Sequence, residues 1–512
     1  MSTHRVVVVG AGMAGLVSAL QLAQQGLDVT VVEAGDSPGG KVHQRLVQGV
    51  GIDSGPTVFT MRWIFDQIFA SVGTTLESEL QIQPLPILAR HFWEDGSSLD
   101  LHADRERSVQ AVREFAGAAE ASRFAGFCDM SQRVYEALEG PFIRSTAPSF
   151  LGMPGRLGAS GLGVLTQLGP FRSLWQSLGQ HFTDPRLRQL FARYATYCGS
   201  SPWQAPATLM LIAQVELNGV WSVRGGMHAL ALCLERLARQ RGAVFRYGNA
   251  CAQILVQGRQ VRGVRLASGE ELPADSVVFN GDVAALSTGL LGEPARAAVS
   301  RKAAPRSLSA LTWSMHAPTQ GVALDRHNVF FTRDYASEFT DIFNDQRLPR
   351  QPTVYICAQD RGADDGPAAG QAERLLCLVN APAVGDRHLP THEALDTCEH
   401  ASFSLLARCG LTLQPLPDNH VRTGPQEFHQ RFPATGGALY GQATHGWMSA
   451  FERAGAPTSL QGLYLAGGSV HPGPGVPMAA MSGQQAAAAL MASPALTRRS
   501  PRAATSGGTS MR

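Results

Sequence analysis

The chain begins with the stretch that most constrains its fold, VVVVGAGMAGLVSALQLAQQGLDVTVVEA at residues 6–34. Its order predicts an apolar strand, a turn at Gly10-x-Gly12-x-x-Gly15, a helix, and a second strand that ends at Glu33. Glycines at these positions permit a sharp turn, close approach of a pyrophosphate to backbone amides, and packing of the helix on the strand. Glu33 lies where a carboxylate would reach the hydroxyls of a ribose. We therefore expect a Rossmann-like dinucleotide-binding unit in an α/β fold.

Two further glycine-rich segments narrow the expected dinucleotide to FAD. The doublet Gly39-Gly40 follows Glu33 closely, a position typical of FAD-binding rather than nicotinamide-binding units. Near the C-terminus, GLYLAGG at 462–468 predicts a strand and a second glycine turn, and an Ala-rich helix follows. The stretch 221–285 predicts a helix at 227–241, a three-stranded meander and a strand that ends at residue 280.

The length of the chain predicts more than one domain, because 512 residues are too many for a single core. The expected segments are an FAD-binding part at 1–104, a helical substrate or membrane-contact region at 105–220, a second FAD-binding part at 221–289, an inserted α+β substrate domain at 290–425, a third FAD-binding part at 426–493, and a disordered tail at 494–512. The tail is polar and basic, so anchoring to anionic lipid is the alternative to disorder.

Composition and charge exclude several classes of protein. A formal net charge of +2 gives no electrostatic reason to expect nucleic-acid binding. The eight cysteines lack the spacing of a metal site, so we expect no metal and interpret them as small buried hydrophobes. No apolar run approaches the length of a membrane span, and the first strand follows the N-terminus too closely for a cleavable signal. These features predict a cytoplasmic protein associated peripherally with a membrane.

The chain also resembles a known family. The resemblance rests on the N-terminal fingerprint with Gly39-Gly40-Lys41, the Gly225-Gly226-Met227 turn, the run Ala274-Asp275-Ser276-Val277-Val278, and residues 463–468 followed by His471-Pro472-Gly473. On these motifs the sequence resembles the flavoprotein amine oxidase and phytoene desaturase superfamily over nearly its whole length. Within it, the segment 53–66 and the run Asn280-Gly281-Asp282 are similar to 1-hydroxycarotenoid 3,4-desaturases. The resemblance implies the FAD-binding fold of that superfamily with an inserted substrate domain.

The resemblance also implies a set of cofactor contacts in three parts of the chain. They are Gly10, Gly12, Ala14 and Gly15 at the pyrophosphate, Glu33 at the adenosine ribose, Gly40 and Lys41 near the diphosphate and ribityl chain, Cys251 at the adenine, Gly467 and Gly468 on the opposite side of the phosphate and ribityl chain, and Val476 and Met478 under the isoalloxazine. No cysteine occurs in the C-terminal motif, so we expect the flavin to be noncovalent.

The activity implied by the resemblance is desaturation of an acyclic 1-hydroxycarotenoid, such as 1-hydroxyneurosporene, at C3–C4 during carotenoid biosynthesis. Hydride would pass to the flavin, the substrate would lie in an apolar tunnel, and oxygen or a membrane quinone would accept the electrons. A tertiary C1 hydroxyl would require a polar group at the deep end of the tunnel, which the sequence does not identify. Asp53, Arg62 and His471 are candidates for a weak base. Their respective alternatives are a turn cap, a surface charge and a packed histidine.

Four other interpretations remain open. A phytoene-type desaturase and a carotenoid isomerase or ketolase belong to the same family. An amine oxidase or protoporphyrinogen-oxidase-like enzyme is disfavoured because SVHPGPGVPMA, at 469–479, lacks the aromatic residue that usually lies against the flavin. A lipid-binding escort protein without enzymatic activity shares the architecture, but flavin motifs at both ends of the chain argue against it.

Overall fold

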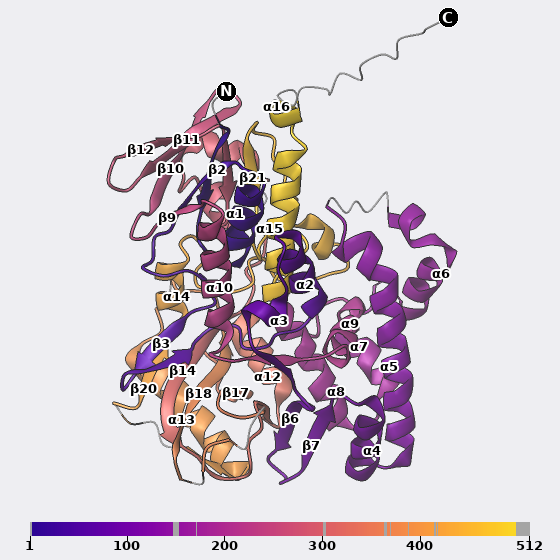
Figure 1. Ribbon diagram of the computed structural model, residues 1–512. Coiled ribbons are helices and arrows are strands. Elements are labelled where there is room, and N and C mark those ends of the chain that lie inside the picture. The colour runs from indigo at the N-terminus through magenta and orange to yellow at the C-terminus, as the bar shows by residue number, and fades with distance from the viewer. Residues whose placement is uncertain are drawn as a thin grey trace, which may run out of the picture.

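A parallel sheet assembled from distant parts of the chain forms one side of the molecule (Figure 1). The computed structural model describes residues 3–146, 153–169, 171–300, 304–362, 366–368, 370–387, 389–413, 416 and 418–497. The sheet has five strands in the order β21 (Leu463–Leu465), β13 (Ser276–Phe279), β1 (Arg5–Val9), β2 (Asp28–Val32) and β9 (Val244–Arg246). This is the Rossmann-like arrangement expected from the glycine-rich unit, because β1 pairs in parallel with β2.

Three helices bury the apolar residues of this sheet: α1 (Met13–Gln24), α10 (Met227–Gln240) and α15 (Val476–Met491). A β-carbon on Gly483 would lie 2.4 Å from the Ala14 carbonyl oxygen, so the absence of a side chain lets α15 cross α1 closely. The Ser18 hydroxyl donates to the Gly483 carbonyl at 3.0 Å across the same crossing. The close crossing brings the C-terminal glycine turn beside the N-terminal one.

An antiparallel meander follows α10 and β9, as the sequence predicts. It consists of β10 (Cys251–Gln257), β11 (Gln260–Leu266) and β12 (Glu271–Pro273), and the short helices α11 (Val283–Ser287) and η4 (Glu293–Ala298) come after β13. The helix predicted at 227–241 and the strand predicted to end at 280 are also confirmed, each to within one residue.

A seven-stranded sheet forms the second layer of strands. Its order is β20 (His420–Thr423), β14 (Ser309–Pro318), β18 (Ala372–Ala381), β17 (Val354–Ala358), β16 (His327–Phe331), β6 (Ile87–Trp93) and β7 (Ser98–His102). The boundary expected at 104 assigns β6 and β7 to the FAD-binding part, whereas β6 pairs in parallel with β16. The sequence pattern of a strand does not identify a partner more than two hundred residues away, so this pairing was not expected, and the domain division stays a prediction.

The remaining elements cover these sheets or connect them. Helical elements between 105 and 217 form one flank of the molecule (Figure 1): α4 (Arg105–Ala116), α5 (Ala118–Leu138), η1 (Glu139–Ile143), α6 (Met153–Leu168), α7 (Leu174–His181), α8 (Pro185–Ala192), η2 (Arg193–Cys198), η3 (Ala207–Met210) and α9 (Leu211–Leu217). Others are α2 (Arg62–Ser71), α3 (Leu76–Glu79), α12 (Tyr335–Phe339), η5 (Thr340–Asn344), α13 (His392–Arg408), α14 (Pro425–Arg431), η6 (Ser449–Glu452) and α16 (Pro494–Thr497). Three strand pairs complete the structure: β3 (Gln44–Val47) with β4 (Val50–Asp53), β5 (Ile82–Pro84) with β8 (Trp221–Val223), and β15 (Gln320–Gly321) with β19 (Leu411–Thr412).

The tail departs from expectation at its start. Disorder is expected from 494, but 494–497 form the short helix α16, and 498–512 lie outside the described residues. Among the described residues, no helix is both long and apolar enough to cross a membrane.

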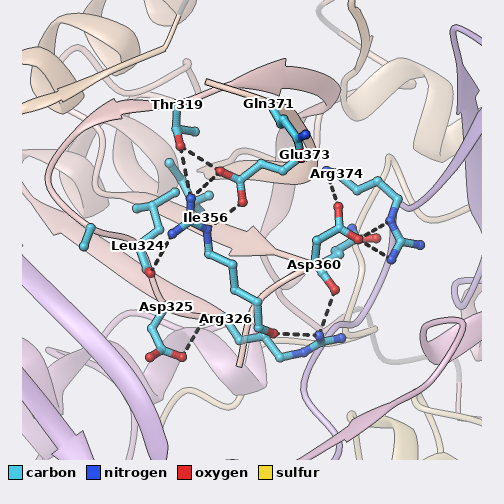
Figure 2. Close-up of polar contacts among 12 residues, drawn as sticks. Thr319, Leu324, Asp325, Arg326, Ile356, Asp360, Gln371, Glu373 and Arg374 are labelled. Atoms are coloured by element: carbon cyan, nitrogen blue, oxygen red, sulfur yellow. Dashed lines mark hydrogen bonds and ion pairs between the residues drawn. The ribbon is translucent and has the colours of Figure 1, made fainter. Parts of the chain in front are cut away.

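Charged side chains form a hydrogen-bonded network at the end of β17 in the seven-stranded sheet (Figure 2). The buried Glu373 carboxylate accepts two hydrogen bonds of 2.7 Å from Arg361. Nearby, Arg326 donates to the Gln359 carbonyl at 3.0 Å. The Gln359 side chain accepts from the Asp53 amide at 3.0 Å and donates to the Asp53 carbonyl at 2.8 Å. The segment that begins at Asp53 is therefore fixed to the seven-stranded sheet through its backbone.

Candidate flavin site

Glu33 holds the N-terminal glycine loop in place. One carboxylate oxygen accepts from the Ala11 amide and the other from the Gly35 amide, each at 2.7 Å. A carboxylate oxygen has two acceptor positions, so both retain one for a ribose hydroxyl. Gly40 approaches the loop so closely that a β-carbon on it would lie 3.2 Å from the Gly12 Cα atom. The doublet at 39–40 therefore lies against the glycine turn.

Asn280 is a residue of this site that no sequence motif assigned to the cofactor. In the orientation that satisfies its hydrogen bonds, its amide oxygen accepts from the Gly12 amide at 3.1 Å and the Gly15 amide at 3.3 Å. The amide nitrogen of Asn280, in that orientation, lies beside the C-terminal turn. A β-carbon on Gly467 would come within 3.3 Å of this nitrogen. The position of Asn280 directly after β13, at the carboxyl end of a parallel strand, was the available signal.

The C-terminal glycine turn lies against the same loop. The Gly467 amide donates to the Ser482 hydroxyl at 3.2 Å, and the Gly468 carbonyl accepts from the buried Arg453 at 3.2 Å. Val476 is the first residue of α15 and is buried, and Met478 is half-buried in the first turn of the same helix. The N-terminal ends of α1 and α15 therefore both belong to this site, and unpaired amides at helix N-termini favour anions.

Lys41 is half-buried between the glycine doublet and the segment at 436–441. Its ammonium donates to the Leu439 carbonyl at 2.5 Å and lies 5.3 Å from the centre of the Phe432 ring. Burial lowers the pKa of Lys41, and the charge of Asp282 opposes that effect. A β-carbon on Gly55 would lie 1.8 Å from the Lys41 carbonyl oxygen, so the segment after Asp53 packs directly on the Lys41 backbone.

Cys251 lies close to Glu33 in space. The turn before it is hydrogen-bonded to the Glu33 strand end, with the Asn249 amide donating to the Glu33 carbonyl and the Gly248 amide to the Gly35 carbonyl, both at 2.8 Å. This location suits a backbone contact to an adenine. All eight cysteines are free and six are buried, and burial raises the pKa of the Cys251 thiol to about 11.

These features fit a bound dinucleotide. The loop has close-packed glycines where a β-carbon would collide with neighbouring backbone, two helices begin beside it, and an acidic side chain with spare acceptor positions lies at the end of β2. Glu33 would bind the ribose, and the first-turn amides of Met13 and Ala14 would bind the pyrophosphate, because Asn280 takes those of Gly12 and Gly15.

Asp53 is one of the three candidates for a weak base. One carboxylate oxygen accepts from Gln44 at 3.1 Å, and the other accepts a short hydrogen bond from the Met227 amide at the start of α10. Burial raises the pKa of Asp53, and these hydrogen bonds oppose the rise. The contacts favour the turn-cap alternative, since the side chain caps a helix.

Arg62 lies at the start of α2 near the surface. It forms an ion pair with Asp66 at 3.2 Å and another with Glu77, and its side chain is 28% exposed. The pairing favours the surface-charge alternative for this candidate, because Asp66 on the same helix and Glu77 on the adjacent α3 are both exposed partners.

His471 is buried in the C-terminal loop. Its Nε2 atom lies 2.8 Å from the Ser145 carbonyl, and its ring meets the Phe142 ring edge-on at 5.1 Å between centroids. Burial lowers the pKa of His471 to about 4, so the ring is neutral and Nε2 donates to the carbonyl. These contacts favour the packed-histidine alternative, and they connect the C-terminal loop to the helical flank.

Comparison with known proteins gives this geometry a family. The model of the family described as "Flavin containing amine oxidoreductase" matches residues 13–491. The chain is 60% identical to a hydroxyneurosporene desaturase of Rubrivivax gelatinosus, over 100% of this chain and 98% of that protein. It is 30% identical to a 1-hydroxycarotenoid 3,4-desaturase of Flavobacterium sp. (strain P99-3), over 93% and 97%.

A solved structure gives the same fold at lower identity. Cyclohexylamine oxidase from Brevibacterium oxydans IH-35A superposes with a TM-score of 0.57 and 16% identity, over 96% of this chain and 99% of that one. At that identity the likeness concerns the fold alone. The family match and the full-length relatives establish that the chain belongs to the flavin-containing amine oxidoreductase family, with FAD as its cofactor, among the carotenoid desaturases of that family.

Proposed function

We propose that the chain is an FAD-dependent desaturase that forms the C3–C4 double bond of acyclic 1-hydroxycarotenoids in carotenoid biosynthesis. The observation that carries the proposal is the full-length similarity to desaturases of this kind, at 60% identity to one of them. The flavin site supports it, because its glycine turns, Glu33 and two helix N-termini are all intact.

The chain's own residues bind and orient rather than react. FAD, when bound, supplies the hydride acceptor. Asn280 and Glu33 hold the loop that carries the diphosphate and ribose sites, so the position of the cofactor is set by backbone geometry. Asp53 fixes the segment that follows it by capping α10 and bonding Gln359. Loss of hydride from an allylic carbon leaves a delocalised cation whose neighbouring proton is acidic, so a strong base is unnecessary.

Incubation of the FAD-loaded enzyme with 1-hydroxyneurosporene in liposomes tests the proposal. The product is expected to have one more conjugated double bond and a red-shifted absorption spectrum. Turnover of phytoene without turnover of 1-hydroxyneurosporene would favour the phytoene-type alternative. Product analysis by mass also separates desaturation, which removes two hydrogens, from isomerisation, which removes none, and from ketolase chemistry, which adds oxygen.

We also propose that the enzyme works at a membrane surface and passes its electrons to oxygen or a quinone. Two aromatic side chains support the membrane contact: Phe171 is 78% exposed and Trp447 is 39% exposed, and their rings meet edge-on at 5.6 Å. An exposed aromatic pair suits a lipid interface. Replacement of Phe171 by Ser should weaken cosedimentation with liposomes. Unchanged cosedimentation would contradict the proposed membrane contact. A separate anaerobic assay with an added quinone distinguishes oxygen from a quinone as the electron acceptor.

A further inference from the structure

A buried cluster of polar side chains lies where the helical flank meets the seven-stranded sheet. Its acid is Glu216 of α9, which is 6% exposed. Tyr194 donates to one Glu216 carboxylate oxygen at 2.7 Å, and Tyr197 donates to the other at 2.9 Å. Both tyrosines belong to η2, so this short helix is fixed to α9 by two hydrogen bonds.

Arg193, the first residue of η2, has an unsatisfied donor in this cluster. Arg193 is only 7% exposed, yet its Nη1 atom has no hydrogen-bond partner among the described residues. Its guanidinium carbon lies 5.9 Å from the centre of the Tyr355 ring. Buried donors in native proteins are nearly always paired, and leaving one unpaired is unfavourable. An acceptor supplied by a ligand would satisfy this one.

Two contacts place the cluster next to segments of the flavin site. The Tyr355 hydroxyl lies 2.7 Å from the Thr57 hydroxyl, in the segment that packs on Lys41 through Gly55. At the end of η2, a β-carbon on Gly199 would lie 2.7 Å from the Tyr440 ring. Tyr355 therefore connects Arg193 to the segment at 55–57, and Tyr440 packs against the end of η2.

The second of these contacts leads to both glycine turns. The Tyr440 carbonyl accepts from Arg453 at 3.3 Å, and the same guanidine nitrogen donates to the Gly468 carbonyl at 3.2 Å. The preceding carbonyl, of Leu439, accepts from Lys41 at 2.5 Å. Tyr440 and Leu439 therefore link the end of η2 to the Gly468 turn and to Lys41.

The charges around Arg193 indicate what kind of acceptor fits. Burial raises the pKa of Glu216, and hydrogen bonds from its two tyrosines together with the charge of Arg193 oppose the rise. Burial likewise raises the pKa of the buried Glu338, and the charge of Arg193 opposes that rise. The charge of Arg193 already acts on two buried acids, so a neutral oxygen acceptor suits the site better than an anion.

We propose that Arg193 is a specificity-determining residue that donates a hydrogen bond to the tertiary C1 hydroxyl of the substrate. The proposal rests on the proposed function. Arg193 would be the polar group that the hydroxylated end of the substrate requires. The hydrogen bond would also fix the position of the carotenoid along its binding site, because C3 is two bonds from the carbon that bears the hydroxyl. An arginine anchored beside the flavin segments selects the hydroxylated end of the carotenoid for reaction.

The test compares two substrates that differ in the hydroxyl group. The FAD-loaded wild type and Arg193→Met are assayed for kcat/KM with 1-hydroxyneurosporene and with neurosporene. Loss of a hydrogen bond to a charged donor should reduce the preference for the hydroxylated substrate by about 10- to 100-fold. Arg193→Lys, which keeps the charge but not the guanidinium geometry, should give an intermediate preference. Arg133→Met, on the exposed face of α5, is the matched control and should leave the preference unchanged.

An unchanged preference in Arg193→Met, or an equal fall in kcat/KM for both substrates, would overturn the proposal. Flavin content and the midpoint of thermal unfolding show whether each variant is folded. If Arg193→Met is unfolded, Arg193→Lys decides: a severalfold loss of preference supports the role of Arg193 and an unchanged preference overturns it. Failure of the wild type to convert 1-hydroxyneurosporene refutes the proposed function, and that result is visible before any variant is made.

Discussion

The flavin site and the polar cluster around Arg193 differ in the groups that make their contacts. Around the flavin site, the contacts involve backbone amides, glycines without side chains, and side chains such as Glu33 and Asn280 that bind that backbone. Around Arg193, recognition depends on side chains: the buried guanidinium, the hydroxyls of Tyr194 and Tyr197, and the buried Glu216 carboxyl group. The first region therefore tolerates little change in backbone shape, and the second little change in charge or hydroxyl groups.

The sharpest test of this contrast is Gly15→Ala in the backbone-built region. A β-carbon there would lie 2.0 Å from the Gly10 carbonyl oxygen, so the loop or the helix must move. We expect loss of bound FAD and a loss of stability of about 1–3 kcal/mol or more. Absorbance at the flavin band and chemical denaturation measure the two effects. Gly126→Ala in α5, where a β-carbon meets nothing within 4 Å, is the control and should keep its flavin.

A smaller effect is expected from Asn280→Ala. The substitution removes the acceptor for two amides of the glycine turn, at 3.1 and 3.3 Å, without adding bulk. The Kd for FAD should rise by about 10- to 100-fold. Titration of the apoprotein with FAD measures this Kd. An affinity equal to that of the wild type would contradict a role of Asn280 in FAD binding.

Glu33→Ala tests the other side chain that holds this loop. The Ala11 and Gly35 amides would lose their acceptor, and the ribose would lose a carboxylate, so FAD retention through gel filtration should fall. Glu33→Gln keeps one acceptor oxygen and should fall less. Equal flavin content in Glu33→Ala and the wild type would refute the ribose role.

In the cluster around Arg193, we expect the stability of the fold to depend on pH through Glu216. Burial raises the pKa of Glu216 above its ordinary 4.5, so the folded state holds this proton more tightly than the unfolded state does. The resulting stability is present below that value and is lost as the pH rises through the folded pKa. The unfolding free energy of Glu216→Gln should therefore depend less on pH in that window than that of the wild type. Parallel pH profiles of the two proteins would contradict this.

The smallest effect is expected from Arg62→Ala, outside both regions. A partly exposed ion pair is worth about 0–1 kcal/mol, so stability should change little. If Arg62 acted on the substrate instead, kcat would collapse while the midpoint of unfolding stayed constant. Steady-state kinetics together with thermal unfolding distinguish these outcomes.

The same contrast explains what the sequence could predict. The strand–turn–helix unit, the meander and the C-terminal helix follow from local signals, because glycine turns and apolar periodicity are local properties. The residues that the resemblance assigned to FAD, from Gly10 to Met478, gather around one loop system, and their roles there stay predictions. Partnerships between distant segments were not predictable: β6 with β16, Asn280 with the glycine turn, and Arg193 with Tyr355. Each depends on tertiary packing that no local pattern encodes.

An anaerobic single turnover is the most direct test of the central claim. Oxidised, FAD-loaded enzyme is mixed with 1-hydroxyneurosporene without oxygen or quinone, and the flavin band and the carotenoid spectrum are followed together. We expect the flavin to bleach in step with a red shift of the carotenoid, with equal amounts of reduced flavin and 3,4-desaturated product. Bleaching without that product, or product without bleaching, would contradict the account.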